Sequence, residues 1–476
     1  MAAHGAEQRQ VAAGLPGLST GVAALTRRGS LKLAAATWLA AAAAPGRAQD
    51  RSDIAPAALA LPITERRLAN GLHVVALPMP QAASVAVQVW YRVGAKDDPP
   101  GRSGFAHLFE HMMFKSTRRM RAEMFDRLTE DVGGQNNAFT SEDVTAYQSE
   151  VPANHLQRLL WAEAERMSNL NVDQLNFDSE RKVVQEEYRQ GVLANPYGRL
   201  WHALPTLHYT RHPYRRPTIG SIEDLARARL DDVRRFHDTY YRPDNAVLLV
   251  CGGFDMAELQ AGVDRTFGSL PAPRGSVPRV NVQEPRRTAD RRVTLRAPGV
   301  PLPALALLWK GPAVSDADTP ALRIASALLS AGESARLNEA LVYRDRSAQQ
   351  AGFEAWLSAD AGMLIGYGIA AAGAPLARIE RGLLAEIQRL ASQPIAPEEM
   401  DKVRAQLLTA ALVKRQSPAG LANSLGEAVL LHGDARRAER ELPELQAVTP
   451  ADVQRVLRRH VLNGRRVTVH YLAQRG

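Results

Sequence analysis

Residues 104–115 read GFAHLFEHMMFK and contain the pattern His-x-x-Glu-His. A helix turns about 100° per residue, so His107, Glu110 and His111 share one face. Two imidazoles one turn apart can hold a single Zn²⁺, which in catalytic sites takes three protein ligands and one water. Because zinc lowers the pKa of that water toward about 7, Glu110 can act as its base. The stretch predicts a catalytic zinc site on a helix whose remaining sides are apolar: Leu108, Phe109, Met112 and Met113.

A third ligand is expected from residues 177–188, FDSERKVVQEEY. Glu187 follows Glu180 by nearly two helical turns, so the two carboxylates share a face with Val183 and Val184. We interpret Glu187 as the third metal ligand and Glu180 as an outer partner that orients a histidine. Two alternatives stay open, a chance pair of core or surface histidines and a solvated Glu-rich helix.

The length of 476 residues exceeds what one hydrophobic core usually organises. Residues 232–236 precede an apolar strand at 247–250, and residues 452–456 precede a strand at 467–471 at the same interval. Each half also opens with a strand, at 85–93 and 304–309. This internal repeat predicts an α+β fold with two homologous α/β-sandwich (roll) domains, each a mainly antiparallel sheet packed with helices. The clearest helical periodicity covers 156–170, 178–192, 376–390 and 398–412.

The predicted division assigns residues 61–268 to an N-terminal zinc-binding domain and residues 290–476 to a homologous domain without metal ligands. Residues 269–289, rich in proline and arginine, form the expected linker.

The beginning of the chain is typical of an export signal. Arg27 and Arg28 precede an apolar run at 33–44, and Gly46 and Ala48 occupy the −3 and −1 places of a cleavage site. We predict a twin-arginine-like signal peptide over residues 1–48 and a periplasmic or secreted protein. An uncleaved anchor is the alternative, but the run is shorter than the roughly 20 residues that span a bilayer.

Charge, hydropathy and cysteine content indicate which partners and cross-links to expect. The formal charge of +9 includes the basic presequence, and the arginines are scattered without interleaved aromatics, so we expect no nucleic-acid partner. No later apolar run predicts membrane insertion after cleavage. Cys251 is the single cysteine, which excludes an intrachain disulfide and suggests a small buried side chain.

These residues resemble the pitrilysin, insulinase and mitochondrial processing peptidase family of inverzincin-type zinc peptidases. That family carries His-x-x-Glu-His and then a glutamate at the interval that separates Glu187 from His111. The resemblance extends over residues 61–472 and includes the motifs Asn70-Gly71-Leu72, GGQNNAFT at 133–140 and His212-Pro213-Tyr214. It implies a half-length bacterial zinc endopeptidase with one Zn²⁺ per chain. It also implies that two such subunits enclose a peptide-sized chamber.

The resemblance further implies that Asn137, Ala138 and Phe139 form an exposed sheet edge, onto which a peptide substrate adds as a strand. An ordinary turn is the alternative reading.

Family members that form the second chamber wall carry an arginine and a tyrosine seven residues later, where this chain has Val342 and Gln349. The expected partner is therefore a homologous subunit that supplies the Arg/Tyr pair, and a homodimer stays open. Rival functions are a zinc-free peptide-binding or core subunit and a zinc hydrolase acting on esters or phosphoesters.

Overall fold

The computed structural model describes residues 60–474. The described residues from 61 onward form one compact unit, and the predicted signal peptide at 1–48 lies outside the described residues. In the described part of the chain, every helix is too short or too polar to cross a bilayer.

The first sheet has six strands in the order β1-β2-β6-β3-β5-β4. Only β2 and β6 pair in parallel, and β4 forms one outer edge. The strand predicted at 85–93 corresponds to β3, and the apolar strand predicted at 247–250 corresponds to the buried strand β6. The bounds are β1 (Thr64–Arg67), β2 (His73–Pro78), β3 (Ser84–Tyr91), β4 (Gln135–Thr140), β5 (Thr145–Pro152) and β6 (Ala246–Gly252).

The second sheet repeats this arrangement without a counterpart of β1. Its order is β7-β11-β8-β10-β9, and β7 and β11 form the one parallel pair. The closing strands β6 and β11 occupy the same place in their sheets, so the predicted α+β class with two mainly antiparallel sheets is confirmed. The bounds are β7 (Arg291–Ala297), β8 (Ala304–Gly311), β9 (Ala348–Leu357), β10 (Gly362–Ala370) and β11 (Arg466–Ala473).

Eight α-helices are described before residue 269 and six after residue 289. The helix predicted at 178–192 ends earlier, at Tyr188, and continues as the π-helix η4 (Arg189–Ala194). The first eight are α1 (Phe105–Met112), α2 (Met124–Glu130), α3 (Leu156–Asn169), α4 (Gln174–Tyr188), α5 (Gly198–His208), α6 (Ile222–Arg227), α7 (Leu230–Tyr240) and α8 (Met256–Thr266). The other six are α9 (Thr319–Ser330), α10 (Leu376–Ser392), α11 (Pro397–Lys414), α12 (Pro418–His432), α13 (Arg437–Ala447) and α14 (Pro450–Leu457).

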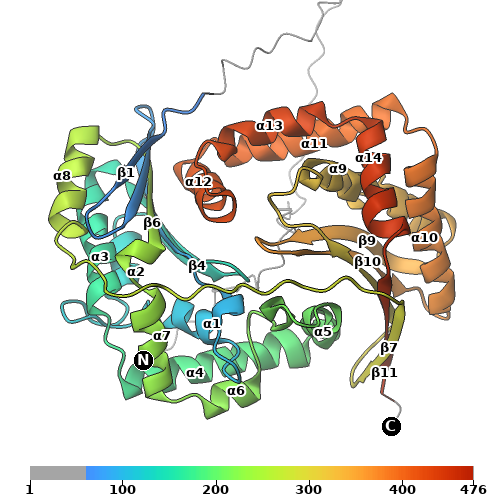
Figure 1. Cartoon of the computed structure of the whole chain (residues 1–476), viewed down its shortest axis with the longest axis horizontal. Helices are drawn as coiled ribbons and strands as arrows, with labels where there is room; N and C mark the ends of the chain where they lie inside the picture. Colours follow the sequence, from blue (N-terminus) through green and yellow to red (C-terminus); the bar gives the residue numbers. More distant parts are fainter. Residues whose placement is uncertain (1–59, 475–476) are drawn as a thin grey trace, which may run out of the picture. The chain divides into compact units, whose positions relative to one another are not determined.

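Each sheet is covered on one face by a helix from the other half of the chain. Leu421 and Leu425 of α12 pack on the first sheet beside Trp90, which is why β3 is buried on both faces and not on one. The approach is close, since a Cβ on Gly426 would lie 2.5 Å from the Trp90 ring. Reciprocally, Leu200 and Leu204 of α5 pack on the second sheet. The stretch between α8 and β7 has no helix or strand and crosses from one half to the other (Figure 1).

Candidate metal centre

The start of helix α1 is held by a buried carboxylate. Asp98 accepts hydrogen bonds from the backbone N–H groups of Gly104 (2.7 Å) and Ala106 (2.9 Å), two of the donors that a helix N-terminus leaves unpaired. Gly104 has a φ of 92°, and a Cβ there would lie 2.7 Å from the carbonyl oxygen of Ile219, so glycine is required. Burial raises the pKa of Asp98 to about 7, although both hydrogen bonds favour its charged form.

The remaining sides of α1 are buried in the first half of the chain. All four apolar side chains predicted to flank the histidines are buried, as expected from their helical spacing. The hydroxyl of Tyr147 on β5 donates to the carbonyl oxygen of Phe109 at 3.1 Å and lies 3.2 Å from the hydroxyl of Tyr241. These contacts fix the rotation of α1, and therefore the direction in which His107 and His111 project.

Helix α4 carries the two predicted carboxylates. Glu180 is buried and Glu187 is mostly buried, whereas Glu186 is exposed and pairs with Arg189, as its rotation around the helix predicts. The expected apolar face is only half correct, because Val184 is fully buried but Val183 is 46% exposed. Val183 lies one residue, or about 100°, around the helix from Val184 and faces away from the core.

The structure brings His107, His111 and Glu187 together. One ligand atom from each lies within 4.8 Å of the other two. Oε2 of Glu187 is 3.4 Å from Nε2 of His111 and 3.6 Å from Nε2 of His107. Ligand atoms about 2.1 Å from one tetrahedral Zn²⁺ are about 3.4 Å apart, so the spacing matches that of zinc ligands.

The hydrogen bonding of the cluster also fits a cation. Oε2 of Glu187 is buried and has no hydrogen-bond partner within the described residues. A buried carboxylate oxygen is costly to leave unpaired, and a cation between it and the two imidazoles would satisfy all three ligand atoms. Two imidazoles and one carboxylate oxygen are a donor set that zinc accepts in catalytic sites.

Glu180 lies behind His111. Its Oε2 is 3.8 Å from Nδ1 of His111, the ring nitrogen opposite the one that faces Glu187. Its Oε1 accepts a 2.7 Å contact from Nζ of Lys115. An acceptor on the far side of an imidazole favours the tautomer that leaves Nε2 free for a metal.

The surroundings of His107 and His111 shift their pKa values in opposite directions. Burial lowers the pKa of His107. Burial also acts to lower the pKa of His111, but Glu187, Glu110 and Glu180 outweigh it, so the net pKa is raised. For Glu187, burial acts to raise the pKa, and the two histidines outweigh it and lower it. The shifts at Glu187 and His107 favour the ionised carboxylate and the neutral imidazole that a metal requires, whereas the raised pKa of His111 means that metal binding must displace its proton.

The residues predicted to bind substrate lie on β4, an edge of the first sheet that packs near α1. Asn137 is exposed, and its Oδ1 accepts a hydrogen bond from the backbone N–H of Ala138 at 2.9 Å. Phe139 instead turns inward and packs edge-on against Trp90, with ring centroids 5.2 Å apart. A peptide could therefore contact the backbone of this edge and the side chain of Asn137.

Sequence reasoning missed several residues that shape this region. Asp98 and Tyr147 were given no role, although an acid shortly before a helix is a recognisable capping signal. Asp143, Lys96 and Tyr214 form a buried polar cluster at the end of β4. No sequence signal connects these three, because their contacts join separate segments of the chain.

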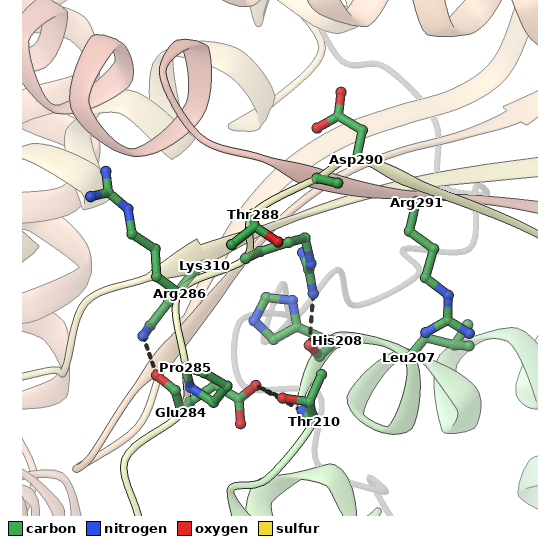
Figure 2. A pocket seen from close by; sticks show the side chains of 12 residues that line it. Leu207, His208, Thr210, Glu284, Pro285, Arg286, Thr288, Asp290, Arg291 and Lys310 are labelled. Carbon is green, nitrogen blue, oxygen red and sulfur yellow. Dashed lines mark hydrogen bonds between the residues drawn. The ribbon is translucent and has the colours of Figure 1, made fainter.

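A cavity of about 330 Å³ lies away from the metal centre, beside residues 284–291. None of the predicted site residues lines it. Two of its cations are already engaged, since Lys310 donates to the carbonyl oxygen of Glu284 and Arg287 to that of His208 (Figure 2). We therefore attach the candidate site to the histidine cluster and not to this cavity.

Comparison with known families shows which class of protein has this fold. The family model described as "Insulinase (Peptidase family M16)" matches residues 73–221, and "Peptidase M16 inactive domain" matches residues 227–407. The zinc protease PqqE of Helicobacter pylori is 33% identical over 342 residues, which cover 71% of this chain and 76% of that protein. The chain belongs to the M16 peptidase family.

Solved structures give the same fold. A protease from Helicobacter pylori superposes with a TM-score of 0.83 at 28% identity, over 87% of this chain and 99% of that one. The periplasmic protease PqqL from Escherichia coli gives a TM-score of 0.70 at 20% identity, over 86% of this chain but only 47% of that chain. The chain is thus a half-length member of the family.

Proposed function

We propose that this chain is a zinc-dependent endopeptidase that hydrolyses peptides or unfolded segments. The observation that carries the proposal is the convergence of His107, His111 and Glu187 within 4.8 Å, at the spacing of zinc ligands. Zinc bound there supplies a Lewis acid that makes water a nucleophile near neutral pH. The relatives named zinc proteases support the same chemistry.

The roles of the protein groups follow from their places on α1 and α4. Glu110 lies on the histidine face of α1, where its carboxylate can accept the proton of the attacking water and pass it to the leaving amine. Glu180 orients His111 through Nδ1, and Lys115 holds Glu180. All of these residues belong to the stretch that matches the insulinase model, and none lies in the stretch matched as an inactive domain.

Extended peptide is the proposed substrate. The unpaired edge of β4 offers backbone N–H and C=O groups to an added strand close to α1, and such pairing reads little sequence. This edge favours peptides over small esters, which would make no use of it. It also explains why we assign Asn137, Ala138 and Phe139 to the substrate site mainly through their main chain.

The working unit we propose is a catalytic subunit paired with a homologous chain. The positions expected to carry the arginine and tyrosine of the second wall hold Val342 and Gln349. The nearby Arg344 is engaged with Glu386 at 3.3 Å, and Tyr343 is half exposed. The same proposal includes an exported protein with a signal peptide at 1–48. It also places a linker at 269–289 between the two domains.

Metal analysis and a quenched-peptide assay test the proposal together. We expect about one zinc per purified mature chain, and peptide cleavage that a chelator abolishes and added zinc restores. Far less than one zinc per chain after zinc supplementation would instead support a metal-free peptide-binding subunit. Cleavage of esters without cleavage of peptides would support the other rival.

A further inference from the structure

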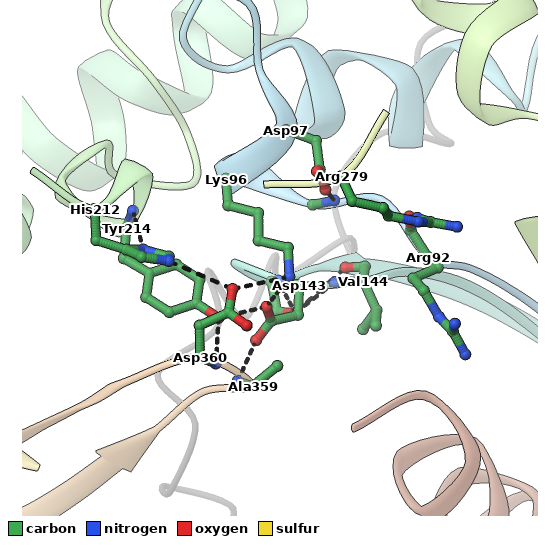
Figure 3. Close-up of polar contacts among 12 residues, drawn as sticks. Arg92, Lys96, Asp97, Asp143, Val144, His212, Tyr214, Arg279, Ala359 and Asp360 are labelled. Carbon is green, nitrogen blue, oxygen red and sulfur yellow. Dashed lines mark hydrogen bonds and ion pairs between the residues drawn. The ribbon is translucent and has the colours of Figure 1, made fainter. Parts of the chain in front are cut away.

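The turn between β4 and β5, residues 141–144, is where the edge strand meets the second half of the chain. Asp143 in this turn is buried. Its Oδ1 accepts hydrogen bonds from Nζ of Lys96 (2.7 Å) and from the hydroxyl of Tyr214 (2.5 Å), and its Oδ2 accepts one from the backbone N–H of Ala359 (2.8 Å), as Figure 3 shows. Ala359 lies in the turn that joins β9 to β10. One carboxylate therefore ties the end of β4 to the half without metal ligands.

Asp360, the next residue of the β9–β10 turn, completes the cluster. Its backbone N–H donates to the hydroxyl of Tyr214 at 3.0 Å, and its Oδ2 is 3.4 Å from both Nζ of Lys96 and Nε2 of His212. Nδ1 of His212 accepts from the N–H of Tyr214, which places the ring proton on Nε2, toward Asp360. A polar network with its members paired holds one geometry.

The same turn also contacts the segment that leads into α1. The backbone N–H groups of Ala95 and Lys96 donate to the carbonyl oxygens of Ser141 and Glu142, at 3.0 and 3.1 Å. Shortly after Lys96, Asp98 caps the first turn of α1. The network thus fixes the end of the edge strand relative to the helix that carries His107 and His111.

We propose that Asp143 and Tyr214, together with the β9–β10 turn, position the free edge of β4 to receive a peptide strand. In this arrangement the half without metal ligands sets how tightly extended substrates bind. The inference rests on the proposed peptidase function. Strand addition needs a row of backbone groups held in line, and among the described strands β4 has only β5 as a neighbour to hold it. Loosening the turn should therefore weaken substrate binding while leaving the metal ligands and the base in place.

Tyr214→Phe tests the inference with the loss of a single hydroxyl. We expect the KM for an extended quenched peptide to rise about fivefold to tenfold, as for loss of one or two hydrogen bonds, with kcat within about twofold and zinc content unchanged. The matched control is Tyr343→Phe, at a half-exposed tyrosine of the second half, which should change neither constant. A loss in kcat at unchanged KM would overturn the inference.

Asp360→Asn tests the same positioning role from the other half of the chain. It replaces Tyr214→Phe as the test if that variant does not fold. Its side chain is 38% exposed, so the substitution should be tolerated, and we expect the KM to rise in the same direction by about twofold to fivefold. Fluorescence anisotropy of a labelled peptide on the Glu110→Gln background should show the same factors in Kd.

The anisotropy measurement separates the two proposals. Unchanged peptide Kd and KM in both variants would overturn the positioning role, whatever the activity of the enzyme. Absence of chelator-sensitive cleavage in the unmodified protein would instead refute the peptidase assignment, and peptide binding would still report on the network.

Discussion

Oε2 of Glu187 lies 3.4 Å from Nε2 of His111, although one residue is on α4 and the other on α1. The distance is longer than a normal hydrogen bond and equal to the separation of two ligand atoms around a zinc ion. This spacing supports the proposed cation site between the side chains of the two helices.

Removing the carboxylate of Glu187 should release the metal. We expect Glu187→Gln to weaken zinc affinity by more than about 100-fold, because loss of even an outer partner costs about 10–100-fold. Metal content after dialysis against a graded chelator series measures it. The adjacent Glu186→Gln, at an exposed side chain that contacts Arg189 and Gln190, should keep full zinc, and equal zinc in both variants would contradict the assignment of Glu187.

Removing the base should separate metal binding from turnover. Glu110→Gln keeps the shape of the side chain but cannot take up the proton, so we expect kcat to fall about 10²–10⁴-fold with zinc retained. Stopped assays on a quenched peptide, with metal analysis of the same sample, measure both. Glu130→Gln, on the exposed end of α2, is the control, and peptide cleavage by Glu110→Gln at the normal rate would remove Glu110 from the mechanism.

Because α12 packs on the first sheet and α5 on the second, each half of the chain should depend on the other for stability. Leu425 of α12 is fully buried against the first sheet, so Leu425→Ala should lower the free energy of unfolding by about 2–5 kcal/mol. Denaturant unfolding followed by tryptophan fluorescence and circular dichroism measures it. Leu412→Ala, at a position 47% exposed, should cost much less. Equal stability of the two variants would show that α12 does not contribute to the first core.

Acid should destabilise the fold through His208. Burial lowers the pKa of His208 to about 3 from its ordinary 6.5, so below pH 6.5 the unfolded chain takes up a proton that the folded chain refuses. Stability contributed by the neutral ring is complete above pH 6.5 and falls by about 1.4 kcal/mol per pH unit as the pH drops toward 3. His208→Gln should show a shallower loss of unfolding free energy between pH 6 and about 4.5. His155→Gln is the control, and an unchanged slope in His208→Gln would contradict a neutral buried imidazole.

A homologous subunit with the Arg/Tyr pair should raise activity. We expect the isolated chain to cleave peptides at least about tenfold more slowly than the mixture, because ordering and closure of a substrate chamber contribute to turnover. Co-purification with the product of an adjacent homologous reading frame, followed by kcat measurement, tests this. Full activity of the isolated chain would support a homodimer or a self-sufficient enzyme.

Local sequence patterns were enough to predict several of the helices and strands and part of the candidate site. The spacing within residues 104–115 was enough to place His107, Glu110 and His111 on one helical face, and the four apolar residues between and after them are buried. Strands β3, β6, β8 and β11 were found from alternation and apolar runs, and the matching interval between the halves indicated the repeat of the sheet. The expected apolar face of α4 was wrong at Val183, which is 46% exposed because it points away from the core. Burial of β3 on both faces depends on α12, a distant segment that covers it.

By itself, the sequence determined the elements and the chemical groups they carry, since helical and strand periodicity act over a few neighbouring residues. Only the tertiary structure decided which distant groups meet: Glu187 with the two histidines, Asp143 with Ala359, and α12 with the first sheet. Such contacts depend on how whole elements pack across the core, and no spacing within one segment encodes that packing.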